Sequence, residues 1–572
     1  MSALKWNLKD LFENDELVES SIKLLTKSSL AFRNKYENKL KDVSNFAECI
    51  KEYEELLQEV SHIMSYAFLS FASDTTQGAF YAKCEEECKI IEENLLFFEL
   101  EFCALDDEFS QKLIDENKDY AFYLSNLLKD KKHRLSKQEE RIMLYLSSTG
   151  ADAFARLFDE SLTELKVKFE GKKLGIEEIL SKLYSKDRSE RKRAAKNFSK
   201  KLKKNSKLLA YILNTIRKEL RVKSTLRAYE DAESFRHISN QISRKSVDAL
   251  IKTSEANFGI VAKYYKKKKE LLGFKELKDY DRYAPLGKDL NIKFDEAKDI
   301  VLKAFEAFSP LFSDIAKQAF DEHWIDVYPA NNKRGGAFSH STTKKSHPYV
   351  LLNYTDKRRD LFTLAHELGH SIHQKLSYKV SFLNQDTPLT TAETASVFAE
   401  MLVFDYVKKN LKNEELLGLY ASKIEDIFAT LFRQINFTTF ERIIHSKDSE
   451  LSVDEINSIW LKESKKMFQD SLSLSDNYKY WWSYIPHFIH SPFYCYAYSY
   501  AQLLVLALYG LYKSKKLDNF TGLYIDMLSS GGSKSPAELI AKFGFNVDDE
   551  KFWKIGILEI QNLVDEFLRF KI

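Results

Sequence analysis

Residues 361–374 read LFTLAHELGHSIHQ and combine the spacing of an amphipathic helix with two histidines four positions apart. On a helix, His366 and His370 lie one turn apart on the same side, so both imidazoles can point at one ion. Glu367 lies beside them and can hold a water molecule without binding the ion itself. This H-E-x-x-H pattern of two ligands and a general base predicts a catalytic zinc site. His373 lies about 10 Å further along the axis than His366, too far to share the ion, and is predicted to be a polar helix residue.

The flanks and the apolar side of this stretch predict the helix. Thr355 or Asp356 can cap its start. An ordinary helix carrying three polar residues is the alternative to a zinc site. Gly369 argues against that alternative, because glycine in a helix costs about 1 kcal/mol relative to alanine. A glycine at this position is useful only where another element packs closely against the helix or where a substrate needs room. The apolar positions recur at helical spacing: Leu361, Leu364, Ala365 and Leu368.

Catalytic zinc takes three protein ligands and leaves one position for water. Leu376 occupies the place where a third histidine would continue the motif, so the third ligand comes from elsewhere. Glu393, 23 residues past the second motif histidine in TPLTTAETASVFAEML (387–402), is predicted to be that ligand. Glu400 lies two turns further along the same helix and is predicted to hydrogen-bond a ligating imidazole. The alternative for Glu393 is a capping box with Thr390 at the start of that helix.

The composition is that of a globular protein with a large core: 572 residues, 44% hydrophobic and 30% charged. The 87 Lys and Arg residues nearly balance the 85 Asp and Glu residues, and the formal charge of +2 argues against nucleic-acid and membrane partners. Five cysteines without a metal-site spacing, and a start without an export signal, predict a reducing cytoplasm. Residues 480–512 contain no Asp, Glu, Lys or Arg, but their histidines, serines and prolines predict a buried helix instead of a membrane span.

The first half of the chain is predicted to be almost entirely helical, because no proline precedes Pro285. One interruption, LTELKVKFEGKKLG, alternates apolar and polar residues before a glycine turn and predicts a short hairpin near 165–175. The basic block 181–210 is predicted to be a solvated helix face, with a nucleic-acid patch as the alternative. Further on, RGGAFSHSTTKKSHPYVLLNY (334–354) predicts two β-segments around a polar turn.

Three motifs in order, AHELGHSIHQ, ETASVFAE and YIPHFIHSPFYCYAYSYA, resemble those of oligoendopeptidase F, of the thimet oligopeptidase-like zinc metallopeptidases. WNLKDLF, FRQINFTTFE (432–441) and SSGGSKSPAEL (529–539) extend the resemblance over most of the chain. It implies a mainly α-helical, bilobed, zincin-type metallopeptidase with a deep substrate channel and a small β-sheet beside the active-site helix. The expected domains are an N-terminal helical region, 1–199, and a zinc metallopeptidase catalytic domain, 200–572.

The resemblance also implies roles for single residues. His366, His370 and Glu393 would bind one zinc ion, Glu367 would be the base, and Glu400 would support a ligand. Tyr496, Tyr494 and His487 match a loop that donates hydrogen bonds to the substrate and the transition state, and His490 is the alternative to His487. In GGAFS, Gly335, Gly336 and Ala337 would lie on a strand edge where a peptide adds as a further strand, although the two glycines could also form only a tight turn.

The expected activity is internal cleavage of short, unstructured peptides. Glu367 would take a proton from zinc-bound water, and would pass it to the leaving amine after attack on the carbonyl. Three alternatives remain open: a related zinc carboxypeptidase, a zinc-containing peptide-binding protein without turnover, and a helical scaffold that binds nucleic acid through residues 181–210. The sequence gives no oligomeric state.

Overall fold

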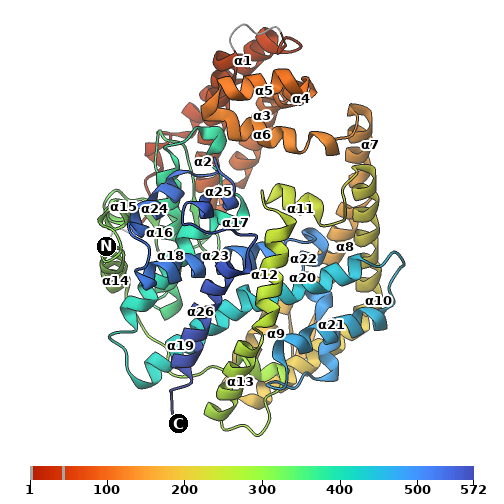
Figure 1. Ribbon diagram of the computed structural model, residues 1–572, viewed down its shortest axis with the longest axis vertical. Coiled ribbons are helices and arrows are strands. Elements are labelled where there is room, and N and C mark those ends of the chain that lie inside the picture. The colour runs from red at the N-terminus through yellow and green to blue at the C-terminus, as the bar shows by residue number, and fades with distance from the viewer. Residues whose placement is uncertain (1–3, 42–45, 572) are drawn as a thin grey trace. The chain divides into compact units, whose positions relative to one another are not determined.

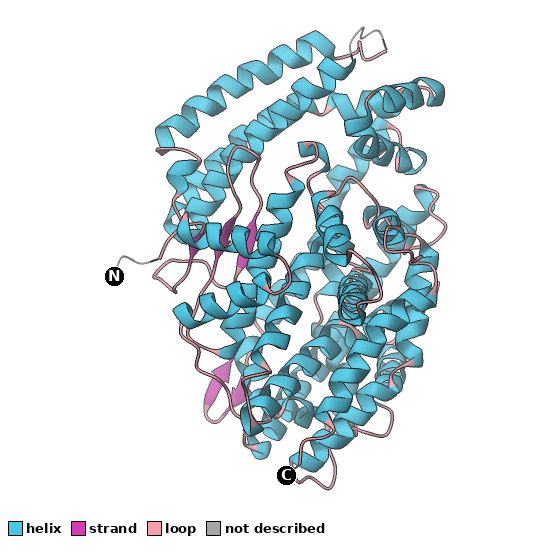
Figure 2. Ribbon diagram, turned by 60° about the vertical axis from the view of Figure 1, so that its left-hand side comes forward, coloured by secondary structure: helices cyan, strands magenta, loops and turns pink. Residues whose placement is uncertain are grey.

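The computed structural model describes residues 4–41 and 46–571, and it is mainly α-helical with only short strands (Figures 1 and 2). Contacts divide the chain into two compact units, as expected for a bilobed fold. Unit 1 comprises residues 1–131, 290–410 and 516–543, and unit 2 comprises residues 132–289, 411–515 and 544–572. The boundary expected between residues 199 and 200 lies inside helix α10 (Arg188–Leu226) of unit 2. Each unit is assembled from three distant segments, which the composition along the chain does not reveal.

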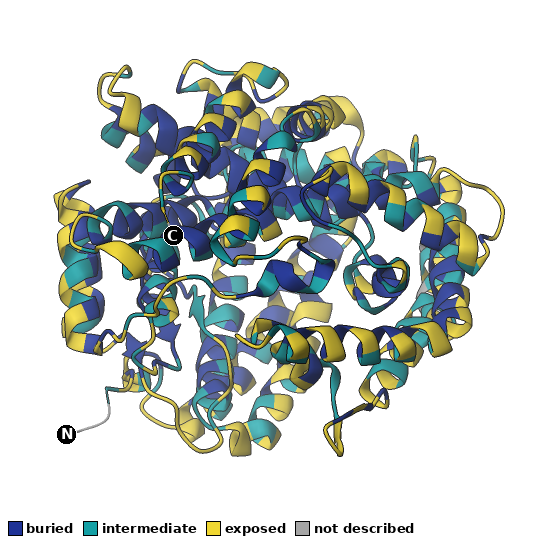
Figure 3. Ribbon diagram, turned by 90° about the horizontal axis from the view of Figure 1, so that it is seen from below, coloured by how far each residue is buried: buried dark blue, intermediate teal, exposed yellow. Residues whose placement is uncertain are grey.

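Unit 1 contains a helical first segment, a small sheet and the helices around it. The helices pack with one buried and one exposed side, which Figure 3 shows as dark blue and yellow faces. The elements of unit 1 are α1 (Asp15–Tyr36), α2 (Phe46–Ser73), α3 (Gly78–Leu95), α4 (Phe97–Ala104), α5 (Asp107–Glu116), α6 (Ala121–Lys129), α14 (Phe294–Glu306), α15 (Pro310–Asp321), β3 (Ile325–Asp326), β4 (Phe338–His340), β5 (Tyr349–Leu351), α16 (Arg358–Ser377), η7 (Phe382–Asn384), α17 (Leu389–Ala392), α18 (Thr394–Val407), α24 (Phe520–Ser529) and α25 (Pro536–Ala541).

Unit 2 is built around the long helix α10, whose exposed side carries Lys192, Lys196 and Lys200. These lysines lie on a solvent-exposed helix face, as predicted for the basic block. The elements of unit 2 are α7 (Lys137–Ser147), α8 (Ala151–Thr163), β1 (Val167–Phe169), β2 (Lys172–Leu174), α9 (Ile176–Ser181), α10, α11 (Ser234–Ser239), α12 (Arg244–Ala256), α13 (Gly259–Leu271), η6 (Asp279–Tyr283), α19 (Asn413–Thr430), α20 (Phe432–His445), α21 (Val453–Phe468), η8 (Asp476–Tyr484), α22 (His487–His490), α23 (Cys495–Ser514) and α26 (Glu550–Phe567).

The sheet of unit 1 has the strand order β3-β5-β4, with β3 parallel and β4 antiparallel to β5. Phe338 pairs with Leu351, and the two β-segments predicted in 334–354 are thereby confirmed. Strand β4 lies at an edge of the sheet and is tied to α16. Gln374 accepts a hydrogen bond from Ser339 Oγ at 2.7 Å and donates one to the Ser339 carbonyl at 3.2 Å. The small sheet therefore lies beside α16, as the resemblance implies.

The hairpin and the uncharged segment also form as predicted. Strands β1 and β2 pair antiparallel around Glu170 and Gly171, which both have positive φ. The uncharged segment ends in α23, which is buried in unit 2. Across the described ranges, no helix combines the length and the apolar character needed to cross a membrane. All five cysteines are buried and reduced.

Candidate metal centre

Helix α16 begins at Arg358, and its N-cap residue is not the predicted Thr355 or Asp356. Lys357 is the N-cap residue, and the Asp360 carboxylate accepts hydrogen bonds from the backbone N–H groups of Thr355 at 2.6 Å and Lys357 at 3.1 Å. Asp356 has a φ of 63°, so it precedes the helix without capping it. The predicted apolar side is confirmed, because all of its members are completely buried: Leu361, Leu364, Ala365 and Leu368.

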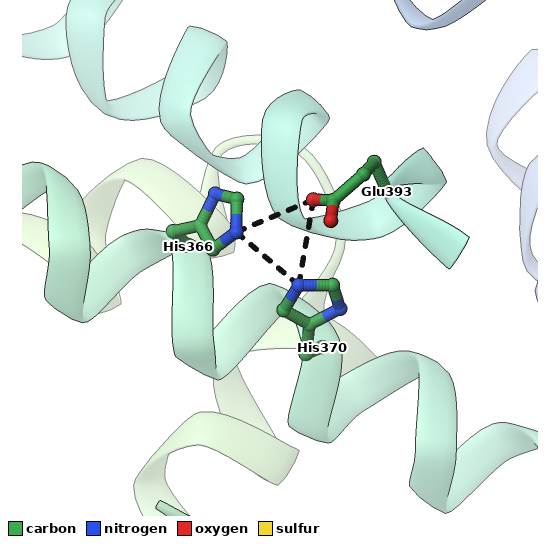
Figure 4. Close-up of side chains that lie close together, drawn as sticks. All are labelled: His366, His370 and Glu393. Atoms are coloured by element: carbon green, nitrogen blue, oxygen red, sulfur yellow. Dashed lines mark hydrogen bonds and ion pairs between the residues drawn. The ribbon is translucent and has the colours of Figure 1, made fainter. Parts of the chain in front are cut away.

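The side chains of His366, His370 and Glu393 converge on one point (Figure 4). The two Nε2 atoms lie 3.2 Å apart, and Glu393 Oε2 lies 3.3 Å from His366 Nε2 and 3.4 Å from His370 Nε2. Ligand atoms bound tetrahedrally to zinc at about 2.0–2.1 Å are about 3.3–3.4 Å from one another. The three donor atoms therefore have the spacing and the chemistry that a zinc ion requires.

Glu393 lies between α17 and α18, where the helical path is briefly interrupted. Its carboxylate accepts a hydrogen bond from Ser396 Oγ at 2.6 Å and faces the two imidazoles. Burial alone would raise the pKa of Glu393, but the hydrogen bonds from His366 and His370 lower it strongly, so the carboxylate stays ionised. An ionised carboxylate between two imidazoles is suited to a cation.

Glu400 lies on α18 and, as the sequence predicts, its side chain reaches a histidine of α16. Its Oε1 atom lies 2.6 Å from His366 Nδ1. This contact directs the opposite ring nitrogen, Nε2, toward the cluster and makes it available as a ligand. Burial would lower the pKa of His366, but the hydrogen bonds to Glu393 and Glu400 raise it well above its ordinary value. The environment of His366 therefore favours positive charge at this point.

Glu367 is 7% exposed and lines the same cavity as His366, His370 and Glu393. Burial raises the pKa of its carboxyl, partly offset by the two histidines. A carboxylate that is poorly solvated binds protons more strongly than one in water. Glu367 is thus a buried carboxylate in the cavity that holds the two histidines, with a raised affinity for protons.

Gly369 allows α16 and α18 to approach closely. A Cβ atom at this position would lie 2.6 Å from the Ala395 carbonyl oxygen and 2.6 Å from Ser396 Cα. Both are backbone atoms of the helix that follows Glu393. The glycine therefore lets the helix that follows Glu393 pack against the helix of the two histidines, which offsets the low helix propensity of glycine.

Gly369→Ala is expected to lower the melting temperature and to weaken zinc binding. The overlap with α18 costs about 1–3 kcal/mol, which outweighs the gain of about 1 kcal/mol in helix propensity. Thermal unfolding and zinc titration measure the two effects. Gly259→Ala is the control, because Gly259 is also helical and a Cβ there meets no atom within 4 Å. A stabilised Gly369→Ala with unchanged zinc affinity would contradict the packing argument.

A cavity of about 480 Å³ adjoins His366, His370 and Glu393. Its walls include residues of α16, Ala337 with the first two residues of β4, and the loop 385–387. Ala337, a predicted peptide-binding residue, lines it, whereas Gly335 and Gly336 do not. Gly336 has a φ of 86°, and the chain bends at the two glycines before the strand. His373 also lines the cavity but is only 6% exposed, and burial lowers its pKa to about 4. As predicted, His373 lies on α16 outside the cluster of His366, His370 and Glu393, and the structure adds that its buried ring forms part of the cavity wall.

The aromatic and histidine loop belongs to unit 2, and its side chains have local partners. Tyr496 is completely buried, and its Oη lies 3.0 Å from His237 Nδ1 and accepts a hydrogen bond from Asn240 Nδ2 at 3.0 Å. His487 Nε2 lies 3.3 Å from Tyr498 Oη. The Arg236 guanidinium lies over the Tyr494 ring, 5.7 Å from the ring centroid. His490 Nε2 lies 2.8 Å from Asp159 Oδ1. Sequence reasoning missed His237 and Asn240, because nothing in their local pattern marks them as partners of a residue more than 250 positions away.

Glu441, at the end of the FRQINFTTFE motif, hydrogen-bonds the backbone of this loop. It is completely buried on α20, and its Oε1 accepts a hydrogen bond from the Phe493 N–H at 2.9 Å. Phe493 has a φ of 58°, a conformation that needs support in a non-glycine residue. Burial raises the pKa of Glu441 to about 8. At neutral pH, the folded protein therefore keeps a proton on Glu441 that the unfolded chain has lost.

Because the folded state keeps this proton, the free energy of unfolding decreases as the pH rises from about 4.5, the ordinary pKa of the carboxyl group, to about 8. In that window the folded state binds more protons than the unfolded state, and the contribution is up to about 1.4 kcal/mol per pH unit. Glu441→Gln is expected to remove this slope, because glutamine is neutral at every pH. Melting temperatures at several pH values measure it, with the exposed Glu450→Gln as control. Parallel pH profiles for the wild type and Glu441→Gln would show that Glu441 is ionised in the fold.

Comparison with known proteins places the chain in a family. The profile of peptidase family M3 matches residues 181–557, and the profile of oligopeptidase F matches residues 101–166. An oligoendopeptidase F homolog from Borreliella burgdorferi is 31% identical over 551 residues, which cover 93% of this chain and 92% of the relative.

Solved structures share the fold. A crystal structure from Chlamydophila abortus has a TM-score of 0.88 at 23% identity and covers 99% of this chain and 98% of its own. The oligoendopeptidase-F from Enterococcus faecium has a TM-score of 0.71 at 21% identity, with coverages of 97% and 98%. The family profile matches more than half of the chain, and the relative and these folds cover nearly all of it. The chain therefore belongs to peptidase family M3.

Proposed function

We propose that this peptidase is a zinc-dependent endopeptidase that hydrolyses internal bonds of short, unstructured oligopeptides. The convergence of His366, His370 and Glu393 at 3.2–3.4 Å, with Glu367 in the same cavity, carries the proposal. Two nitrogens and one carboxylate oxygen are a ligand set that suits zinc. The name of the Borreliella burgdorferi relative, an oligoendopeptidase F homolog, supports internal cleavage.

The residues of the cavity have separate tasks in the proposed reaction. A zinc ion held by His366, His370 and Glu393 would supply a Lewis acid for the scissile carbonyl and for water. Glu367 accepts the proton of the attacking water and then delivers it to the leaving amine. Glu400 fixes the orientation of the His366 ring through its 2.6 Å contact.

Strand β4 offers the peptide a place to bind. It is an edge strand, and Ala337 and Ser339 at its start line the cavity. An extended peptide can add to such an edge through main-chain hydrogen bonds, which give affinity with little dependence on sequence. Gly335 and Gly336 precede this edge, and no atom lies within 4 Å of a Cβ on either, so a peptide backbone could approach closely there. This binding mode suits an enzyme that accepts many peptides.

We further propose that donors on the loop of unit 2 bind the substrate. Tyr494, Tyr496 and His487 are the assigned residues, with His490 as the alternative to His487. A phenol or imidazole donor would stabilise the negative charge that develops on the carbonyl oxygen. The assignment rests on the match of the loop motif.

A matched pair of peptides tests internal cleavage. One peptide of medium length is blocked at both ends, and the other has the same sequence with a free carboxyl end. Products are identified by mass spectrometry with the zinc-loaded protein. The proposal predicts an internal cut in both peptides. Stepwise trimming of the unblocked peptide alone would identify a carboxypeptidase, and intact peptides that nevertheless bind would identify a peptide-binding protein.

A further inference from the structure

Two acceptor side chains in the cavity wall lie outside the proposed chemistry. Gln385 and Asp386 follow η7 in the loop that leads to α17, and both line the cavity that holds His366 and Glu367. Their local sequence, LNQDTP, has no spacing that marks them as functional. Their place in the wall puts them beside any peptide that occupies the cavity.

Among the described residues, neither the Gln385 amide oxygen nor the Asp386 carboxylate has a hydrogen-bond partner. Gln385 is 6% exposed, and its Oε1 has no hydrogen-bond partner among the described residues. The Asp386 carboxylate is accessible, and within residues 4–41 and 46–571 it has no hydrogen bond or ion pair. Desolvation raises the pKa of Asp386, and no charged group of the described residues contributes to the shift. An accessible carboxylate without a cation partner at the wall of the cavity is free to pair with a cationic group of a ligand.

The loop is also held rigidly, so these acceptors are fixed in place. The Gly532 N–H donates a hydrogen bond to the Asn384 carbonyl at 2.8 Å. A Cβ on Gly532 would lie 2.0 Å from the Asp386 carbonyl oxygen, so only glycine permits this packing. Asn384 Nδ2 donates a further hydrogen bond to the Asp119 carbonyl at 2.9 Å. The SSGGS turn thus supports the loop, which gives the SSGGSKSPAEL motif a structural task.

We propose that Gln385 and Asp386 bind a positively charged group of the peptide substrate, either a Lys or Arg side chain or a free α-amino group. Both residues present acceptors, and a carboxylate with an amide oxygen suits an ammonium or guanidinium donor. The other carboxylates of the cavity, Glu367 and Glu393, have assigned tasks in the reaction. The inference rests on the proposed peptidase function and specifies which peptides it favours.

The test uses peptides that differ in one residue. A doubly blocked peptide carries Lys, norleucine or Glu at each position next to the cleaved bond in turn, and kcat/KM is measured with the zinc-loaded chain. Wild-type protein is expected to favour Lys over norleucine by about tenfold or more at one position. Asp386→Asn is expected to reduce this ratio to about twofold or less, chiefly by lowering kcat/KM for the Lys peptide. Asp314→Asn, an exposed change on α15 of the same unit, should keep the preference.

A further variant and a further peptide identify the charged group and show that the effect of Asp386→Asn is not a loss of folding. Asp386→Lys is expected to favour the Glu peptide instead. A norleucine peptide with a free amino end distinguishes the two sources, because a preference confined to it assigns the site to the α-amino group. Equal rates for Lys and norleucine peptides with no gain from a free amino end, or a preference that persists in Asp386→Asn, would overturn the inference.

A binding measurement separates this inference from the proposed function. Fluorescence anisotropy gives the Kd of the labelled Lys and norleucine peptides for wild type and Asp386→Asn. If no peptide is cleaved, the peptidase proposal fails, and the Kd ratio still decides whether Asp386 selects a cation. A tighter Kd for Lys that is lost in Asp386→Asn supports the site, and equal Kd values refute it.

Discussion

Glu367→Gln is expected to lower kcat by about 100- to 10,000-fold while zinc content stays at the wild-type level. Glutamine has nearly the shape of glutamate but cannot accept the proton of the attacking water. The three ligand atoms belong to other residues, so the metal site keeps its geometry. Hydrolysis of a doubly blocked fluorogenic peptide measures kcat, and elemental analysis of the purified protein measures zinc.

The control for this change is Glu296→Gln, which alters an exposed glutamate on α14 of the same unit. It should retain wild-type turnover and zinc. Should Glu367→Gln turn over as fast as wild type with zinc bound, Glu367 is not the base. A loss of zinc in Glu367→Gln would instead place Glu367 among the ligands.

Glu393→Ala is expected to abolish both zinc retention and peptide cleavage. The remaining imidazoles, His366 and His370, cannot hold zinc as three ligands do, and removing an anionic ligand also removes the charge that favours the cation. Zinc retained after gel filtration and peptide turnover measure the two losses. Circular dichroism should show an unchanged helix content, because Glu393 lies at an interruption between two helices.

His323→Asn serves as the matched control, because His323 is exposed in unit 1 and asparagine tolerates its φ of 57°. It should keep zinc and activity. Normal zinc affinity in Glu393→Ala would mean that another residue supplies the third ligand. The convergence in Figure 4 would then be a structural ion pair.

Local patterns in the sequence predicted the helix and its histidines correctly. Apolar spacing determines which side of α16 is buried, and the four-residue interval places His366 and His370 on one side. The place of Glu400 also followed from its interval, since its 2.6 Å contact with His366 Nδ1 is the one expected. The short hairpin and the strands around the polar turn followed from alternation and turn residues in the same way.

Features that depend on distant segments could not be predicted. Each unit combines three separate stretches of chain, so no local change of composition marks its limits. The helical spacing showed that His373 is too far from the ion, but not that β4 and the loop 385–387 enclose it in a cavity wall. Gly369 suggested a close neighbour, and only the structure identifies Ala395 and Ser396 as that neighbour. Gln385 and Asp386 gave no signal, because their role depends on what surrounds them.

The most direct test of the account is a metal-exchange experiment with one doubly blocked peptide. The protein is stripped of metal with a chelator, dialysed, and assayed before and after zinc is restored, with products identified by mass spectrometry. We expect an internal cut that disappears on stripping and returns with about one equivalent of zinc per chain. An internal cut that persists at full rate in the metal-free protein would contradict the assignment of His366, His370 and Glu393 as a catalytic zinc site.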